Sequence, residues 1–447
     1  MEICTIGGYE EVGKNMTAVK IGDDVILFDA GLFLPPIIEM QEKEAQTKYT
    51  EKKLREVGAI PDDLILDKLG WTNKVRAIVV GHAHLDHVGG IPYIAHRYPN
   101  ANIYATPFTM EILESILRDE NINLKNKRIH IKSDSTITIK GKSQELKLEF
   151  VHTTHSTLQC VFIALHSREG IFFYALDFKF DNYPIIGKPS NYKRLRELGR
   201  IGIKALVVDA LYSGTDRRTA SERIARNLVE DALSTVRDRK SALFITTFSS
   251  HIARLKSVVD FGKRTNRKII FIGRSLNKYI NAANKVRECS FYKSIRLVRF
   301  KNQVNSILKQ VEKDRGKYLV VCTGHQGEPG SILDRITNEE TPFKFRPGDN
   351  LIFCSSVIPS QVNISSRDRM DKKLRKKGVR IQADVHVSGH GGREDLRDLL
   401  EMLKPKHVIP AHGSLQQETP MIELAGEMGY KFHENSHLSN NGKLLKI

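Results

Sequence analysis

Gly81-His82-Ala83-His84-Leu85-Asp86-His87 is the segment from which the rest of this 447-residue sequence can be interpreted. It follows an apolar run from Val75 to Val80, which predicts a buried strand. Imidazole and carboxylate groups are ligands that zinc and similar divalent metals accept. If a short turn and a helix follow the strand, the first two histidines can face one metal, while Asp86 and His87 face a second. The clustering of four ligand-type side chains therefore predicts a metal site.

More histidines and acids occur at the ends of apolar runs elsewhere in the chain. The run Ile171 to Phe178 carries an acid near its end, and an ionised Asp within such a strand is costly unless it is paired or bound to a metal. The same arrangement of an apolar run with a His or an acid at its end recurs along the sequence. The candidates found in this way are Asp29, His155, Asp177, Asp209, His390 and His412.

Length and charge restrict the class of protein. A chain of 447 residues can bury a large core and is expected to form two or more domains. The formal net charge of +18 favours a polyanionic partner, with nucleic acid first and an anionic membrane surface second. No run approaches the roughly 20 apolar residues that span a bilayer, and no secretory signal is recognisable. The five scattered cysteines indicate reduced, buried thiols in a cytoplasmic protein.

From about residue 216 the pattern changes to a regular alternation of helices and strands. A helix is expected over Arg217–Arg237, and strands over Ala242–Thr247, Lys268–Gly273 and Lys317–Val321. Such alternation predicts a largely parallel sheet. In open α/β sheets, ligands bind at the carboxyl ends of the strands, where this sequence has polar turns rich in small residues.

Taken in order, the motifs resemble the β-CASP branch of the metallo-β-lactamase superfamily. The segment from His82 to His87 matches the H-x-H-x-D-H signature, and a His at the position of His412 is the form associated with members that act on RNA. Within the branch, Thr-Gly-x-Gln-Gly-Glu-Pro at 323–329, Val-Ser-Gly-His at 387–390 and Pro-x-His-Gly at 410–413 look most like the ribonuclease J family, in its short archaeal form without the extra C-terminal domain of many bacterial members.

The resemblance implies an α/β fold, in which a metallo-β-lactamase αββα sandwich is interrupted by an inserted α/β β-CASP domain. The expected division is 1–212 for the N-terminal part of the metallo-β-lactamase domain, 213–366 for the β-CASP domain and 367–447 for the C-terminal part of the metallo-β-lactamase domain. The resemblance also implies two zinc ions per chain. His82, His84 and His155 would hold one zinc, Asp86, His87 and His412 the other, and Asp177 would bridge them, while Asp29 would orient a ligand.

Two zinc ions would supply a nucleophile at neutral pH and stabilise charge at phosphorus. His390 is expected to protonate the leaving 3′-oxygen, with Asp209 polarising its ring, and Asp86 counts among the catalytic as well as the metal-binding candidates. Ser388, Gly391 and Gly392 could offer hydroxyl and backbone N–H groups to a terminal phosphate. Arg274 and the loop 323–331, which includes His325, are expected to hold the sugar-phosphate backbone.

The expected function is a zinc-dependent ribonuclease that hydrolyses RNA phosphodiesters, mainly as a 5′→3′ exonuclease favouring 5′-monophosphate ends, with possible endonuclease activity. The expected partner is single-stranded RNA, with no membrane association, and the assembly is expected to be a homodimer. Three alternatives stay open at this point. They are an endonuclease of the mRNA 3′-end cleavage type, a non-catalytic RNA-binding scaffold, and a small-molecule hydrolase, the last being disfavoured by the inserted domain and the charge.

Overall fold

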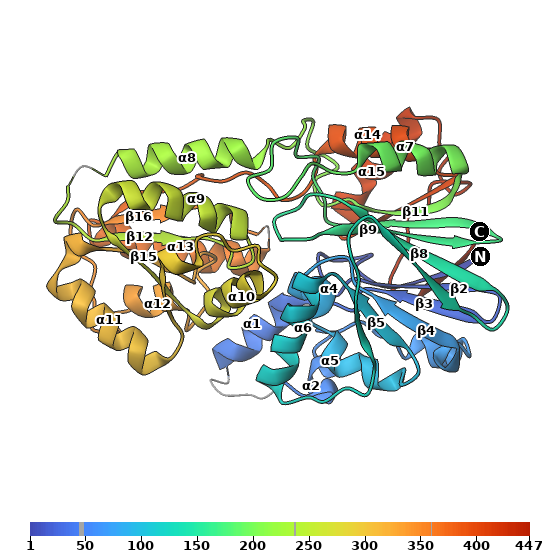
Figure 1. Ribbon diagram of the computed structural model, residues 1–447, viewed down its shortest axis with the longest axis horizontal. Coiled ribbons are helices and arrows are strands. Elements are labelled where there is room, and N and C mark those ends of the chain that lie inside the picture. Colours follow the sequence, from blue (N-terminus) through green and yellow to red (C-terminus); the bar gives the residue numbers. More distant parts are fainter. Residues whose placement is uncertain (44–48, 237, 359) are drawn as a thin grey trace.

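The computed structural model describes residues 1–43, 49–236, 238–358 and 360–447. It contains three β-sheets, and Figure 1 shows them in two bodies that lie side by side. The body at the right holds both ends of the chain and two of the sheets, and the body at the left is formed by the middle of the chain. Among the described residues, no helix combines the length and the apolar character that crossing a membrane requires.

The right-hand body is built on two sheets that face each other. The first has the order β19-β1-β2-β3-β4-β5-β6 and the second the order β18-β11-β10-β9-β8-β7. The strands of the first are β1 (Glu2–Gly7), β2 (Met16–Ile21), β3 (Asp24–Phe28), β4 (Val75–Val79), β5 (Asn102–Ala105), β6 (Arg128–His130) and β19 (Lys443–Lys446). Those of the second are β7 (Ser135–Lys140), β8 (Glu145–His152), β9 (Val161–Ser167), β10 (Gly170–Ala175), β11 (Ile203–Asp209) and β18 (His407–Ala411).

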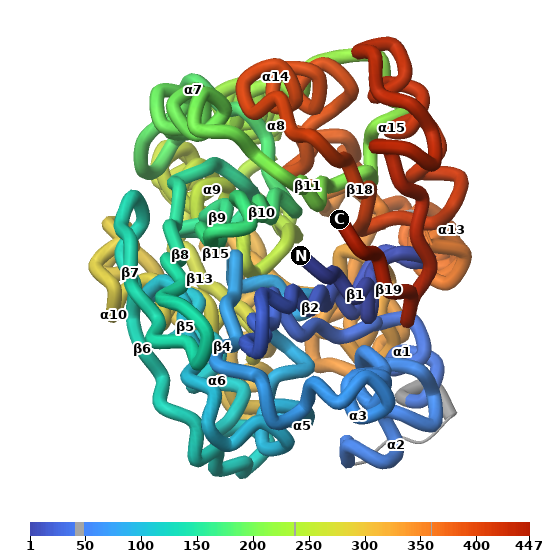
Figure 2. Tube along the Cα trace, turned by 90° about the vertical axis from the view of Figure 1, so that its right-hand side faces the viewer, coloured from blue at the N-terminus to red at the C-terminus, as the bar shows by residue number. Residues whose placement is uncertain are grey.

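Apolar side chains from both sheets form the core between them, including Phe28 and Val79 from the first and Phe150 and Phe172 from the second. Helices cover the two outer faces, so this body is an αββα sandwich, as expected. The first sheet is covered by α1 (Leu34–Lys43), α2 (Glu51–Glu56), α3 (Ile65–Lys68), α4 (Leu85–Val88), α5 (Ile91–Ile94) and α6 (Pro107–Glu120), and the second by α7 (Tyr192–Ile201), α14 (Arg393–Leu403) and α15 (Leu415–Glu427). Figure 2 shows β1 and β19, which carry the two termini, side by side.

The left-hand body is a sheet whose strands are all parallel, in the order β14-β13-β15-β12-β16-β17. Its strands are β12 (Leu243–Thr246), β13 (Lys268–Ile272), β14 (Arg296–Val298), β15 (Tyr318–Cys322), β16 (Asn350–Phe353) and β17 (Arg380–Gln382). One face is covered by α8 (Glu222–Ser234), α9 (Ile252–Gly262) and α10 (Arg274–Lys285), and the other by α11 (Lys301–Lys313), α12 (Ile332–Thr337) and α13 (Gln361–Lys376). This is the inserted α/β domain, and its edge strand β17 lies beyond residue 366, where the sequence placed the end of the insertion.

The connection into the inserted domain differs from the expectation. The helix expected from Arg217 begins at Glu222, after a Ser221 N-cap, and ends at Ser234, while Arg237 lies outside the described residues. The preceding segment is irregular because its polar groups bond to the loop before α14 and to the first turn of α14 instead of forming a helical turn. The Thr219 N–H donates to Asp395 at 2.8 Å, and the Thr219 hydroxyl donates to the carbonyl of His390 at 2.7 Å.

Candidate metal centre

The sandwich brings the histidines and acids together because most of them follow parallel strands. The strands β3 and β4 are parallel neighbours in one sheet, and β10, β11 and β18 are parallel neighbours in the other. The carboxyl ends of parallel neighbours meet at one edge of a sheet, which is where ligands bind in such sheets. The residues that end or follow these strands are Asp29, His82, Asp177, Asp209 and His412. They converge at this edge with His84, Asp86 and His87 of the loop and helix after β4, and with His155 after β8.

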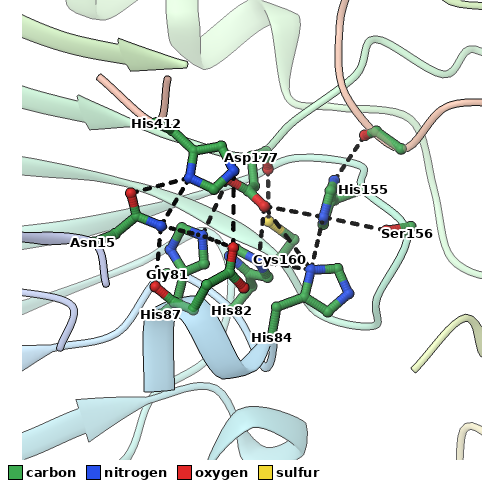
Figure 3. Close-up of polar contacts among 12 residues, drawn as sticks. Asn15, Gly81, His82, His84, His87, His155, Ser156, Cys160, Asp177 and His412 are labelled. Carbon is green, nitrogen blue, oxygen red and sulfur yellow. Dashed lines mark hydrogen bonds and ion pairs between the residues drawn. The ribbon is translucent and has the colours of Figure 1, made fainter. Parts of the chain in front are cut away.

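His82, His84, His155 and Asp177 form the first group of facing ligand atoms (Figure 3). The Nδ1 atom of His84 lies 3.1 Å from Nε2 of His82 and 3.1 Å from Nε2 of His155. The Oδ2 atom of Asp177 lies 3.3 Å from Nε2 of His82 and 3.4 Å from Nε2 of His155. Four ligands at zinc-bond lengths on the corners of a tetrahedron are separated by about 3.3–3.4 Å. The group therefore fits one zinc ion.

The second group consists of Asp86, His87, Asp177 and His412. Nε2 of His87 lies 3.1 Å from Oδ1 of Asp177 and 3.7 Å from Oδ2 of Asp86. Nε2 of His412 lies 3.6 Å from Oδ1 of Asp177 and 3.8 Å from Oδ2 of Asp86. These separations are slightly wider than in the first group and fit a second cation with nitrogen and oxygen ligands.

Asp177 belongs to both groups because its two oxygens face opposite ways. Its carboxylate is buried, and Oδ1 has no hydrogen-bond partner within the described part of the protein. Burial opposes ionisation, but the surrounding histidines, led by His412, outweigh it and hold the pKa of Asp177 well below its usual range. A buried, charged carboxylate with an oxygen that accepts no hydrogen bond is costly, and a cation between the two groups would remove that cost.

The backbone around the centre adopts conformations that non-glycine residues rarely take. Asp29, Asp177 and His412 have φ values of 58°, 23° and 61°. Left-handed conformations of this kind are unfavourable for such residues and cluster at functional sites. Next to Asp29, a Cβ atom added to Gly31 would lie 1.6 Å from the carbonyl oxygen of Asp86. Glycine is therefore required for the loop after β3 to approach α4, the helix that carries Asp86 and His87.

Several polar groups orient His87, His155 and His412 through hydrogen bonds with Nδ1, the ring nitrogen that is directed away from the centre. His87 donates from Nδ1 to Asp29 at 2.7 Å, and Asp29 also accepts from the Tyr174 hydroxyl at 3.0 Å. His412 donates from Nδ1 to Asn15 at 3.0 Å. His155 donates from Nδ1 to the carbonyl of Gly389 at 2.7 Å. In each case the opposite nitrogen is left to face the centre, which is how hydrogen bonds fix the orientation of metal-binding histidines.

His390 lies beside the centre but outside the two groups of four. Its Nδ1 donates to Asp209 at 2.7 Å, and its Nε2 lies 3.7 Å from Oδ2 of Asp177. Burial disfavours the charged ring, but Asp177 and Asp209 outweigh it and raise the pKa of His390 to about 9. A protonated imidazole with one N–H directed at the centre can donate a proton there.

The hydrogen bonds around His390 differ from the expectation for its neighbours. The Gly391 N–H donates to the carbonyl of Phe178 at 2.6 Å, and the Gly392 N–H donates to Asp395 at 2.9 Å. The Ser388 hydroxyl bonds the backbone of His390, accepting from its N–H at 3.0 Å. The two glycine N–H groups are thus not free to meet a phosphate in this conformation. The short sequence motif could not reveal this, because the acceptors of the two glycine N–H groups lie in the loop after β10 and on α14.

The two candidate RNA contacts in the inserted domain lie in different surroundings. Arg274 is exposed at the first position of α10. His325 is buried after β15, where its ring packs edge-on against Phe248 with centroids 4.3 Å apart. Both ring nitrogens of His325 lack a hydrogen-bond partner within the described residues. The sequence placed both residues at strand ends of the parallel sheet, and the structure has them there.

Comparison with known proteins agrees with the architecture. Residues 9–172 match the metallo-beta-lactamase superfamily, residues 240–368 match the family described as ribonuclease J, beta-CASP domain, and residues 378–433 match the Zn-dependent metallo-hydrolase RNA specificity domain. A crystal structure of a protein of unknown function from Enterococcus faecalis has a similar fold, with a TM-score of 0.64 and 16% identity over 99% of each chain. Fold and site together define a β-CASP metallo-hydrolase of the metallo-β-lactamase superfamily.

Similar sequences narrow this class. The chain is 39% identical to ribonuclease J of Pyrococcus abyssi over 100% of this chain and 97% of that protein. It is 36% identical to ribonuclease J of Methanocaldococcus jannaschii over 100% and 99% of the two chains. Similarity to ribonuclease J 1 of Streptococcus pyogenes, at 29%, covers 100% of this chain and 74% of that one. The chain belongs to the ribonuclease J family, and it is a metallo-hydrolase of the ribonuclease type.

Proposed function

We propose that the protein is a two-zinc 5′→3′ exoribonuclease that favours RNA with a 5′-monophosphate and takes part in RNA decay and processing. The observation that carries the proposal is the position of Asp177, whose two oxygens face two separate groups of histidines and acids. Pairs of metal ions act in phosphodiester hydrolysis. When both ions are bound to the protein, they provide a nucleophile at neutral pH and stabilise negative charge on phosphorus.

The protein's own groups have separate tasks in this proposal. His82, His84 and His155 would hold one zinc, Asp86, His87 and His412 would hold the other, and Asp177 would serve both. The orienting residues behind them keep the ligand nitrogens aimed at the centre. His390 then gives its proton to the leaving 3′-oxygen, and Asp209 holds the ring so that Nε2 faces the scissile bond. The support for this division is that both groups of four are complete without His390.

Recognition of the RNA end is proposed to involve the loop that carries His390. Ser388 is the member of this loop that could turn toward a phosphate, since its hydroxyl bonds only the adjacent backbone of His390 among the described contacts. Gly391 and Gly392 would contribute the close backbone approach, with a local shift that releases an N–H. Arg274 and His325 would meet the chain further along, at the strand ends of the inserted sheet.

Assembly and location complete the proposal. A homodimer is proposed from the family resemblance, and sedimentation at micromolar concentration tests it directly. A cytoplasmic location is proposed on the basis of the five cysteines, all of which are buried and free. Thiols of this kind are typical of proteins in a reducing compartment.

The decisive experiment uses one RNA prepared with a 5′-triphosphate or a 5′-monophosphate, labelled at either end. The proposal predicts progressive release of mononucleotides from the 5′ end, faster for the monophosphate form. Internal fragments that appear equally fast with both 5′ ends would instead indicate an endonuclease. Binding without cleavage, in zinc-loaded protein, would indicate an RNA-binding scaffold.

A further inference from the structure

One metal-binding histidine is oriented from outside the metallo-β-lactamase body. The acceptors behind His87, His155 and His412 are Asp29, Gly389 and Asn15, which all belong to that body. Behind His84, the acceptor is Ser250, in the loop between β12 and α9 of the inserted domain. The Ser250 Oγ lies 3.0 Å from Nε2 of His84.

The direction of this hydrogen bond follows from the position of the other ring nitrogen of His84, Nδ1. Nδ1 of His84 lies 3.1 Å from the ligand nitrogens of both His82 and His155, so it is the atom that faces the first group. Nε2 therefore carries the proton and donates it to Ser250. Ser250 is 5% exposed, so water has little access to replace the serine hydroxyl as the acceptor.

A second residue of the inserted domain contacts the same metal-binding loop. The hydroxyl of Tyr279, on α10, donates to the backbone carbonyl of Ala83 at 3.2 Å. Ala83 is buried between His82 and His84, so this bond holds the turn that separates the two ligands. The Tyr279 ring also packs against Phe108 of α6, with centroids 6.3 Å apart.

The two contacts lie within a larger interface between the inserted domain and the metallo-β-lactamase body. Figure 1 shows α10 next to α6 where the two bodies meet. Lys278 and Lys285 of α10 pair with Asp119 and Glu111 of α6, each at 2.8 Å. These ion pairs are partly exposed and contribute little energy individually, but they show that α10 and α6 are in direct contact.

We infer that Ser250 and Tyr279 are positioning residues through which the inserted domain completes the metal centre. Ser250 fixes the ring of His84 with Nδ1 toward the metal, and Tyr279 fixes the loop that carries it. Partners of this kind in the shell behind a ligand typically change metal affinity by 10- to 100-fold. The first zinc site thus has its full affinity only while the inserted domain is docked. This inference rests on the metal centre proposed above.

The test measures zinc affinity of the full-length protein by competition with a chromophoric chelator. Ser250→Ala should weaken one zinc site by about 10- to 100-fold. Tyr279→Phe keeps the ring but loses one neutral hydrogen bond, and a loss of about 2- to 10-fold is expected. The control is Ser257→Ala, a buried serine of the same domain whose hydroxyl donates to the Ala253 carbonyl within α9, and its affinity should match the wild type.

Cobalt(II) loading adds a readout that depends on ligand geometry. The visible absorption of the cobalt protein should change in Ser250→Ala and stay the same in Ser257→Ala. Unchanged zinc affinity in Ser250→Ala would overturn the inference, as would an equal loss in Ser257→Ala, which would indicate general loosening of the domain. A wild-type protein that binds no zinc at all would instead refute the proposed metal centre itself.

Discussion

Replacing His390 by Ala should remove catalysis while leaving the metal content and RNA binding nearly unchanged. Its Nε2 lies 3.7 Å from Asp177, and its Nδ1 is held by Asp209 at 2.7 Å. Both groups of four ligands remain complete without it, so zinc should be retained. A positioned general acid typically contributes about 10²- to 10⁴-fold in rate, which corresponds to about 3–5 kcal/mol in the activation barrier.

The assay is single-turnover cleavage of a 5′-labelled RNA with enzyme in excess, recorded beside zinc content and RNA affinity. Asp209→Asn should reduce the rate less than His390→Ala, because the amide can still bond the ring. The double variant should be far from additive, because the two residues act as a unit. His407→Ala, in the first residue of β18, is the control and should keep the full rate. Loss of a zinc from His390→Ala, or a rate equal to wild type, would refute the reasoning.

Asp177→Asn should lower the zinc content at both sites, since each oxygen faces one group, and elemental analysis that finds one ion per chain fully retained would contradict the bridging role. Burial raises the pKa of Glu418 to about 10, and the negative charges of Glu11 and Glu10 act in the same direction. The stability that the protonated Glu418 carboxyl contributes is therefore fully present below about pH 4.5 and is lost as the pH rises toward 10. Compared with Glu418→Gln, the wild type should therefore lose up to about 4 kcal/mol of unfolding free energy between pH 6 and 9, whereas parallel denaturation curves of the two proteins would exclude this. RNA affinity should fall steeply with salt, by about 10³- to 10⁵-fold between 50 and 200 mM if 6–10 phosphates are contacted, and a flat fluorescence-anisotropy titration would show that the charge of +18 is not a binding surface.

The fold and most of the side chains at the candidate metal centre could be predicted from the sequence. Ligand-type residues stood at the ends of apolar runs, and parallel strands bring such ends together. This rule accounts for the convergence of His82, Asp177 and His412, whereas His155 follows the antiparallel strand β8. The αββα sandwich and the interruption by an inserted α/β domain were expected from the family resemblance, and the structure has both. Asp29 also lies behind His87, where a carboxylate that orients a ligand was expected.

Contacts that depend on the packing of distant elements could not be predicted in this way. Asn15 stands in a glycine-rich loop, Tyr174 within an apolar strand and Ser250 in a polar turn, and none has a local pattern that signals contact with a histidine. The irregular segment before Glu222 was missed for the same reason, because its hydrogen-bond partners lie far away in the sequence. Similarly, the N–H groups of Gly391 and Gly392 were expected to be free and are bonded within the protein.

The metal content of the purified protein tests the central claim most directly. Zinc measured by mass spectrometry should approach two ions per chain in the wild type. His82→Ala combined with His84→Ala should remove the first ion and abolish hydrolysis, while the circular dichroism spectrum stays close to that of the wild type. A protein that hydrolyses RNA at full rate with both histidines replaced, or that cleaves RNA after complete removal of metal, would contradict the claim.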